Sequence, residues 1–352
     1  MKKCSPQSYS SAKLLRFWVL EQGSKIENNT DNGGDSLRYA IISDIHGNLI
    51  AFQAVLKDIY YNQIDKIILL GDYCIDFPWA NEVVNLIRSF DNTYVIRGNK
   101  EDYFINMEKE DPSSWNCEQL GAIYWNYREL ALSNREYLKS LPERLDISDG
   151  DNKIYLAHMP EMFFGKIFAD TLTGADYPFI VSAYPGISHQ DYLKYANKII
   201  KNDRKLTDRL NRLPDGIYLF GHYHTQWYAE ISGKLLINPG SCGLPMDNDN
   251  RASYTILDCN GPKCTVEEHR ISYDVELTIN LLKNSGLYKA AEIWSKINIL
   301  HLKTGRQYIN DFLQYVENVS RERGEETRPY SNELWKSSAE KWFLKQDKHL
   351  WI

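Results

Sequence analysis

The feature of this 352-residue chain that most constrains its fold is a series of short apolar runs, each ending in a polar motif. The runs are Tyr39 to Ile42, Lys66 to Leu70, Thr93 to Ile96, Lys153 to Ala157 and Ile217 to Phe220. Continuous apolar runs of this length are typical of parallel strands that are covered on both faces. Segments with apolar residues at helical spacing, 49–61 and 81–90, follow the first two runs. This alternation predicts an α/β sheet with its chemistry at the strand ends.

Polar side chains that can bind metal ions follow every one of these runs. They are Asp44 and His46 of Asp-Ile-His, Asp72 of Gly-Asp, Asn99 of Gly-Asn, the lone His158, and His222 and His224 of Gly-His-Tyr-His. Carboxylate oxygens and imidazole nitrogens suit Mn, Fe or Zn, and an asparagine adds a carbonyl oxygen without adding charge. The order of the motifs, with a strand before each, predicts a centre that holds two metal ions.

Each motif also has an ordinary structural explanation when it is taken alone. Asp72 would cap a turn, Asn99 would cap a helix that begins near Glu101, and His158 would be a hydrogen-bonded core histidine. Because five such coincidences would have to occur in one order, we favour the metal centre. The remaining histidines have no comparable context and are assigned no role: His189, His269, His301 and His349.

The motif series resembles that of the calcineurin-like metallophosphoesterase superfamily, in which D-x-H, G-D, G-N, H and G-H-x-H occur in this order. The resemblance covers about residues 38 to 272. The segment 237–245, Ile-Asn-Pro-Gly-Ser-Cys-Gly-Leu-Pro, and the following Arg251-Ala252-Ser253-Tyr254 are similar to the small bacterial and archaeal phosphodiesterase-like branch. The resemblance implies two stacked mixed β-sheets flanked by helices, a metallophosphatase-like sandwich.

The resemblance also implies a role for each ligand and the identity of the cofactors. The implied assignments are Asp44, His46 and His224 for the first metal ion, Asn99, His158 and His222 for the second, and Asp72 as a bridge between them. The cofactors would be two divalent or trivalent ions of Mn, Fe or Zn, with Mn expected to serve in vitro. A hydroxide shared by the two ions would attack phosphorus.

Asp72, Asn99, Arg97 and Lys100 are the candidate catalytic residues. Many family members carry a histidine where this chain has Lys100, and that histidine protonates or stabilises the leaving group. A lysine supplies positive charge but is a poor proton donor near neutral pH unless its pKa falls. Arg97 matches an arginine that contacts phosphate in phosphoprotein phosphatase relatives, and it equally suits a structural ion pair. Both alternatives for Arg97 stay open at this point.

The activity that the resemblance implies is metal-dependent hydrolysis of phosphate esters of small molecules, namely phosphodiesters, nucleotides or dinucleoside polyphosphates. The expected partner is therefore a small phosphorylated substrate, with nucleotides among the candidates. A phosphoprotein phosphatase is one alternative, which the Arg97-Gly98-Asn99 run favours and the missing histidine weakens. A non-catalytic metal-binding scaffold is the other alternative, and the presence of every ligand argues against it.

Composition argues against several other classes of protein. The net charge of −6 does not suit a general nucleic-acid binder, because capture of phosphate backbones needs a basic surface. No run approaches the roughly 20 apolar residues of a transmembrane helix. The stretch Leu14 to Leu20 is too short for a signal peptide and contains Arg16, so a cytoplasmic location is expected. The six scattered cysteines form no C-x-x-C pair and are expected to be reduced.

Three regions surround or interrupt the predicted catalytic domain, 38–272. Residues 1–37 are expected to be poorly structured, because they contain a polar, turn-rich stretch. Residues 159–214 form an insertion that is expected at the rim of the site. In one alternative its aromatic residues and its basic helix bind a nucleotide. In the other the aromatic residues pack on the core and the basic helix faces solvent. Residues 275–352 are expected to be helical, with aromatic residues that pack on the catalytic domain or, in a homo-oligomer, on a second copy.

Overall fold

The computed structural model describes residues 36–165, 202–325 and 327–346, together with residues 191, 194 and 198. Nearly all of the N-terminal segment 1–37 and most of the insertion 159–214 therefore lie outside the described residues. The chain from Ser36 onward forms one compact unit.

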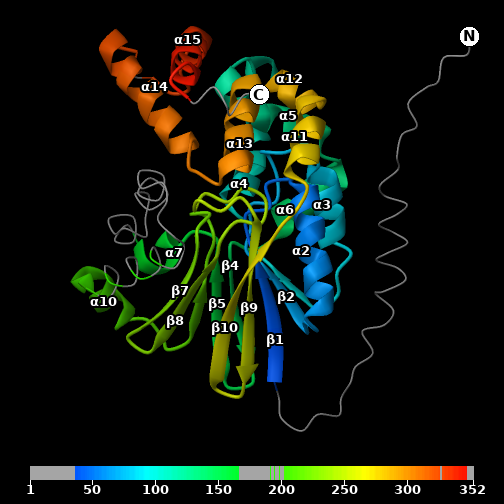
Figure 1. Cartoon of the computed structure of the whole chain (residues 1–352), viewed down its shortest axis with the longest axis vertical. Coiled ribbons are helices and arrows are strands. Elements are labelled where there is room, and N and C mark those ends of the chain that lie inside the picture. Colours follow the sequence, from blue (N-terminus) through cyan, green and yellow to red (C-terminus); the bar gives the residue numbers. More distant parts are fainter. Residues whose placement is uncertain are drawn as a thin grey trace, which may run out of the picture. The chain divides into compact units, whose positions relative to one another are not determined.

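Two mixed five-stranded β-sheets make up the centre of this unit (Figure 1). The first sheet has the order β10-β9-β1-β2-β3, with β1 Ser36–Ile42, β2 Lys66–Leu69, β3 Thr93–Val95, β9 Ala252–Asn260 and β10 Lys263–Ile271. The second sheet has the order β4-β5-β6-β8-β7, with β4 Arg144–Asp149, β5 Asn152–Ala157, β6 Ile217–Leu219, β7 Gln226–Ile231 and β8 Lys234–Pro239. Strands β1, β2 and β3 are parallel, as are β5, β6 and β8. Strand β9 is antiparallel to β1 and to β10, and β4 and β7 are antiparallel to their neighbours β5 and β8.

The sheets pack face to face through apolar side chains. Ile41 and Ile68 of the first sheet share a buried cluster with Leu156, Leu219 and Ile237 of the second. Sheet-on-sheet packing of this kind buries the inner face of both sheets. The predicted sandwich of two mixed sheets with flanking helices is confirmed.

Helices flank the sheets and extend beyond one end of them (Figure 1). The α-helices before the last two strands are α2 Leu49–Tyr61, α3 Ala80–Ile87, α4 Asn99–Met107, α5 Gly121–Glu129, α6 Leu132–Ser140, α7 Glu161–Phe164 and α10 Arg204–Leu210, with 3-10 turns at Pro112–Ser114 and Glu118–Leu120. The C-terminal helices are α11 Val275–Lys283, α12 Gly286–Ala290, α13 Glu292–Thr304, α14 Ile309–Arg323 and α15 Asn332–Phe343. Among the residues that the structure describes, no helix is long and apolar enough to span a lipid bilayer.

Two features of the fold are not evident from the sequence. Residues 113–141 read as one long helical region, but the structure divides this region into two 3-10 turns, α5 and α6, with a break between α5 and α6. The side chain of Asn81 holds the break open: it donates to the carbonyl of Glu129 at 2.8 Å and accepts from the amide of Ala131 at 2.9 Å. Strand β4 was not predicted, because Ile147 is its one buried residue and its pattern reads as polar.

The expectation that every cysteine is reduced is wrong for one pair. Cys259 and Cys264 form a disulfide, with their Cα atoms 4.1 Å apart. The physical reason is register, since the two residues face each other directly across the β9–β10 hairpin. Cys74, Cys117 and Cys242 are free, as predicted, and Cys4 lies outside the described residues.

The C-terminal helices have an apolar core of their own, whereas their aromatic residues were expected to pack on the catalytic domain or on a second copy. Its buried members are Ile293, Ile297, Leu300, Tyr308, Phe312, Val316, Tyr330, Leu334, Trp335, Ala339 and Trp342. Packing onto the catalytic part of the same chain is confirmed for α13, through contacts given below. A homo-oligomer through these helices stays a prediction.

Arg270 forms a buried ion pair and also a hydrogen bond between the two sheets, and these contacts give a first prediction. Arg270 of β10 binds both carboxylate oxygens of Asp247 and donates to Gln226 of β7 at 2.7 Å. Arg270→Ala would leave the buried Asp247 charge unpaired, so we expect the free energy of unfolding to fall by about 3–5 kcal/mol. Urea denaturation measures this loss. The control is Arg251→Ala, which removes a half-exposed pair with Asp249 and should cost about 1 kcal/mol or less; equal losses would contradict the prediction.

Candidate metal centre

The predicted ligands all follow the C-terminal ends of parallel strands, and these ends meet at one edge of the sandwich. Asp44 and His46 follow β1, Asp72 follows β2, Asn99 follows β3, His158 follows β5, and His222 and His224 follow β6. Backbone hydrogen bonds join the first two motifs: the amide of Asp44 donates to the carbonyl of Gly71 at 3.1 Å, and the amide of His46 to that of Asp72 at 2.9 Å. The structure thus brings all the predicted ligand side chains together.

The backbone at these ligands is strained. Asp44, His46, Asp72, His222 and His224 have φ angles between 55° and 73°, in the left-handed region. Residues other than glycine adopt this region at a cost of roughly 1–2 kcal/mol each. Strain of this kind concentrates at functional sites, where the surrounding fold maintains it. Its concentration in one set of side chains indicates that the fold positions them for chemistry.

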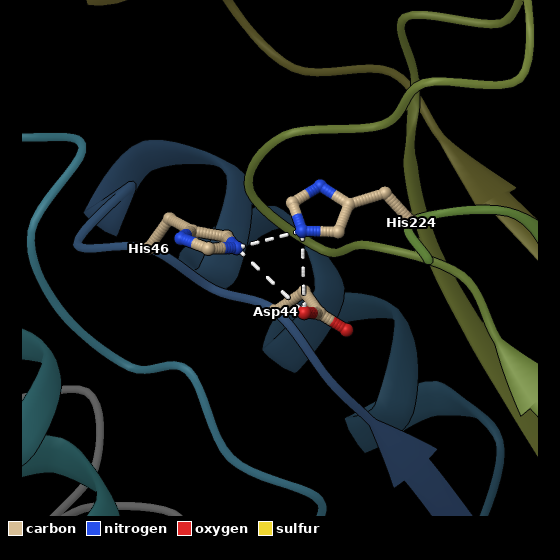
Figure 2. Close-up of side chains that lie close together, drawn as sticks. All are labelled: Asp44, His46 and His224. Atoms are coloured by element: carbon tan, nitrogen blue, oxygen red, sulfur yellow. Dashed lines mark hydrogen bonds and ion pairs between the residues drawn. The ribbon is translucent and has the colours of Figure 1, made fainter. Parts of the chain in front are cut away.

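One group of ligands consists of Asp44, His46 and His224, all of them buried (Figure 2). The Nε2 atoms of His46 and His224 lie 3.0 Å apart. Asp44 Oδ1 lies 3.3 Å from Nε2 of His224 and 3.7 Å from Nε2 of His46. Figure 2 shows the carboxylate and both rings converging on one point from the loops after β1 and β6.

The tautomers of the two rings test whether this group fits a cation. His46 Nδ1 lies 2.6 Å from Asp76 Oδ2, and His224 Nδ1 lies 2.6 Å from the carbonyl of Leu244. A carbonyl oxygen only accepts hydrogen bonds, so Nδ1 of His224 donates, and the ion-pair contact with Asp76 favours a proton on Nδ1 of His46. In the form that binds a metal ion, each ring would then turn an Nε2 lone pair toward the other ring and toward Asp44. Lone pairs that converge in this way fit a bound cation, and the contacts at Nδ1 orient the rings for it.

The second group gathers around Asn99 and Asp72. Asn99 Oδ1 lies 2.9 Å from His222 Nδ1 and 3.1 Å from His158 Nε2, and Asp72 Oδ1 lies 3.4 Å from His158 Nε2. The other oxygen of Asp72 faces His46 Nε2 at 3.9 Å. The two oxygens of Asp72 thus point to different groups, as a bridging ligand requires. The assignment of each ligand to one ion stays a prediction.

The charges in the centre favour a bound cation. Burial alone would lower the pKa of His46, but Asp76, Asp44 and Asp72 raise it to about 9. Burial likewise opposes the charged form of His158, yet Asp72 and Asp44 raise its pKa to about 10. Protons or metal ions therefore neutralise the buried carboxylates, and the two compete for the same ligands.

Comparison with known proteins identifies the family. Residues 37–261 match the calcineurin-like phosphoesterase superfamily domain. The chain belongs to the calcineurin-like phosphoesterase superfamily. An uncharacterized protein of Methanocaldococcus jannaschii is 31% identical over 245 residues, which are 67% of this chain and 88% of that protein.

Two solved structures support this result. The metallophosphoesterase from Sphaerobacter thermophilus has a TM-score of 0.50 and 25% identity, and the match covers 73% of this chain and 99% of that one. A hypothetical protein from Pyrococcus horikoshii OT3 has a TM-score of 0.53 and 20% identity, with coverage of 77% and 100%, and supports the fold. Membership of the superfamily implies a metal-dependent hydrolase that acts on phosphate esters.

Sequence reasoning missed two carboxylates that organise the centre of this phosphoesterase. Asp76 is buried and orients His46. Glu101 is also buried, and it accepts from the amides of Gly98 at 2.8 Å, Asp72 at 2.9 Å and Tyr73 at 2.8 Å. Burial, with the nearby charge of Asp72, raises the pKa of Glu101 to about 7. The position of Glu101 three residues after a helix cap was a usable signal, whereas no local pattern marks Asp76.

The structure corrects one prediction for Asn99. Gly98, and not Asn99, is the N-cap of α4. Asn99 is the first residue of that helix, and its side chain points to His158 and His222. The helix-cap alternative for Asn99 is therefore wrong.

The structure shows ion pairs at Arg97. Its guanidinium donates to Asp102 Oδ1 at 2.8 Å, to the carbonyl of Leu141 at 2.6 Å and to Glu143. Each terminal nitrogen of a guanidinium carries two N–H groups, and each uses one of them in these contacts. The ion-pair alternative is therefore shown, and a contact between Arg97 and phosphate stays a prediction.

Lys100 stands beside the centre as a cation. Its Nζ lies 3.5 Å from Asp76 Oδ2 and 5.9 Å from the centroid of the Trp294 ring. Burial would lower the pKa of Lys100, but Asp76 and Asp72 raise it above its usual value. Lys100 therefore keeps its positive charge at neutral pH, and its catalytic role stays a prediction.

The described ends of the insertion 159–214 pack on the core. Phe163 and Phe164 of α7 and Leu206 and Leu210 of α10 belong to one buried cluster on the second sheet. For these residues the packing alternative is confirmed. The other aromatic residues proposed to meet a base lie outside the described residues: Phe168, Tyr177, Phe179 and Tyr184.

Proposed function

We propose that this phosphoesterase hydrolyses small phosphate esters, namely phosphodiesters, nucleotides or dinucleoside polyphosphates, with two bound metal ions. The observation that carries the proposal is that two groups of potential ligands adjoin, Asp44 with His46 and His224, and Asp44 with Asp72 and His158. Asp44 belongs to both groups, and the two oxygens of Asp72 face His158 and His46. Adjoining groups joined by carboxylates suit a pair of cations that bind one phosphoryl group.

The ligands would divide between the two ions according to their neighbours in the structure. One ion would lie among Asp44, His46 and His224, the other among Asn99, His158 and His222, with Asp72 between them. When bound, the ions would supply Lewis acidity toward the phosphoryl oxygens and toward water. The chain itself orients the rings through Nδ1: His158 donates to the carbonyl of Leu70 at 2.8 Å, His224 donates to the carbonyl of Leu244, and His46 contacts Asp76.

The test of this proposal compares two substrates. The manganese-loaded protein is assayed for initial rates on bis(nitrophenyl) phosphate, a diester, and on nitrophenyl phosphate, a monoester, with the chelated protein as control. Metal-dependent turnover of the diester is the expected result. A clear preference for the monoester would replace the diesterase proposal with a phosphatase. If the protein with two bound ions hydrolysed neither substrate, the result would contradict the enzymatic function and favour the non-catalytic scaffold.

The charge on Lys100 leads to a prediction about leaving groups. Because Lys100 stays protonated beside Asp76, it stabilises negative charge but does not deliver a proton. We therefore expect rates to fall steeply as the pKa of the leaving group rises. A series of aryl phosphodiesters from nitrophenol to phenol measures the slope. Similar rates across the series would show that a proton donor is present.

No observation favours the phosphoprotein phosphatase alternative. That alternative depended on Arg97, which Asp102 and Glu143 hold in ion pairs. A phosphopeptide assay under the same conditions separates the two activities.

A further inference from the structure

Helix α13 reaches the metal centre although it lies outside the residues 37–261 that match the superfamily domain. Trp294 Nε1 donates to Asp76 Oδ1 at 2.6 Å. Asn298, fully buried one turn later on the same helix, donates through Nδ2 to the carbonyl of Asp76 at 3.2 Å. One face of α13 thus holds both the side chain and the backbone of Asp76.

Asp76 transmits this contact to a ligand. Its two oxygens have different partners: Oδ1 accepts from Trp294, and Oδ2 lies 2.6 Å from His46 Nδ1. The indole N–H therefore fixes the rotation of the carboxylate, and the carboxylate fixes the tautomer and orientation of the His46 ring. Carboxylates behind metal-bound histidines act in this way on ligand basicity and geometry.

The C-terminal end of the same helix contacts the loop 246–250, which bonds the backbone of the other histidine of the group. The carbonyl of Gly305, the residue that ends α13, accepts from the amide of Asn248 at 2.9 Å. The carbonyl of Leu302 accepts from Asn250 Nδ2 at 3.0 Å. At the near end of this loop, the amide of Met246 donates to the carbonyl of His224 at 3.1 Å. One end of α13 is therefore linked to His46 through Asp76, and the other end to the backbone of His224 through the loop 246–250.

We propose that α13 positions a ligand of the metal centre. Trp294 and Asn298 are the positioning residues, and they act through Asp76 on His46. The C-terminal helices then complete the first metal site. The inference rests on the proposed function, because a positioning role presupposes that these histidines bind a metal ion.

The experiment compares two tryptophan substitutions of the same kind. Trp294→Phe removes the N–H that holds Asp76 and keeps an aromatic ring. The control, Trp342→Phe, removes the N–H that donates to Asp311 Oδ2 at 2.8 Å in the core of the C-terminal helices. In the full-length chain, manganese affinity is measured by calorimetric titration, and the absorption spectrum of the cobalt-loaded protein reports ligand geometry.

We expect Trp294→Phe to bind manganese about 10-fold more weakly than wild type, the lower end of the range for removing a direct partner of a ligand, because Trp294 holds that partner, Asp76, and not the ligand itself. The cobalt spectrum should change in Trp294→Phe and stay as in wild type in Trp342→Phe. Asn298→Ala should weaken affinity in the same direction. Wild-type affinity and spectrum in Trp294→Phe, or equal changes in both tryptophan variants, would overturn the proposal.

The same measurements separate this proposal from the proposed function. Wild-type protein that binds manganese but hydrolyses no phosphate ester would contradict the proposed function, and the affinities of the two variants would still decide the role of α13. Wild-type protein that binds neither manganese nor cobalt would overturn both.

Discussion

Asp72→Asn is expected to abolish turnover while the chain stays folded. Asp72 Oδ1 faces His158 and Oδ2 faces His46, so its charge serves both ligand groups. Asparagine preserves the size of the side chain and keeps an oxygen that can accept from the amide of Lys100, now 2.8 Å away. It also tolerates the φ of 57° at this position better than most residues do. The substitution therefore removes the charge with little change in backbone strain.

The expected loss of turnover on the nitrophenyl diester is more than about 100-fold. This loss exceeds the effect of removing a side chain that only hydrogen-bonds a metal ligand. Metal content per chain should fall in parallel, while circular dichroism and the melting temperature of the metal-free protein change little. The matched control is Asp149→Asn, which removes a carboxylate bound to Tyr39 and Lys66 at the far ends of the strands. Substantial turnover in Asp72→Asn with two ions still bound would contradict the proposed mechanism.

The sequence predicts the parts of this molecule whose signals are local. Helix α2 begins at Leu49 because Asn48 precedes it, and the Asn48 side chain accepts from the amide of Ala51 at 3.2 Å. The β1 run Tyr39 to Ile42 and strand β6 are continuous apolar runs because both of their faces are buried, and a run of this kind is visible without a structure. Each ligand follows such a run directly, so the ligands could be found together with the strands.

The parts that could not be predicted depend on partners far away in the chain. Trp294 lies 218 residues from Asp76, and no local pattern in either segment reports their hydrogen bond. The ion pair of Arg97 with Glu143, 46 residues later in the chain, is likewise reported by no local pattern. The break between α5 and α6 depends in the same way on Asn81, which lies 50 residues before Ala131.

Gly71→Ala is expected to disrupt the centre and to destabilise the fold strongly. The residue has a φ of +102°, and an added Cβ would lie 2.5 Å from the amide nitrogen of Gly98. The backbones of the Gly-Asp and Gly-Asn motifs therefore touch, and this contact sets the distance between Asp72 and Asn99. We expect about 1–3 kcal/mol of backbone strain and a further roughly 1–3 kcal/mol from overpacking. Urea denaturation without metal measures the total loss.

Gly233→Ala separates the effect of close contact from the effect of backbone strain. Gly233 also has a positive φ, +72°, but no atom lies within 4 Å of an added Cβ, so its loss should be limited to about 1–2 kcal/mol. Manganese stabilises a folded chain that binds it and leaves a chain without sites unchanged. We therefore expect manganese to raise the urea midpoint of wild type and Gly233→Ala but not of Gly71→Ala. If Gly71→Ala lost no more stability than Gly233→Ala and kept the gain from manganese, the contact between the two glycines would not be what positions Asp72 and Asn99.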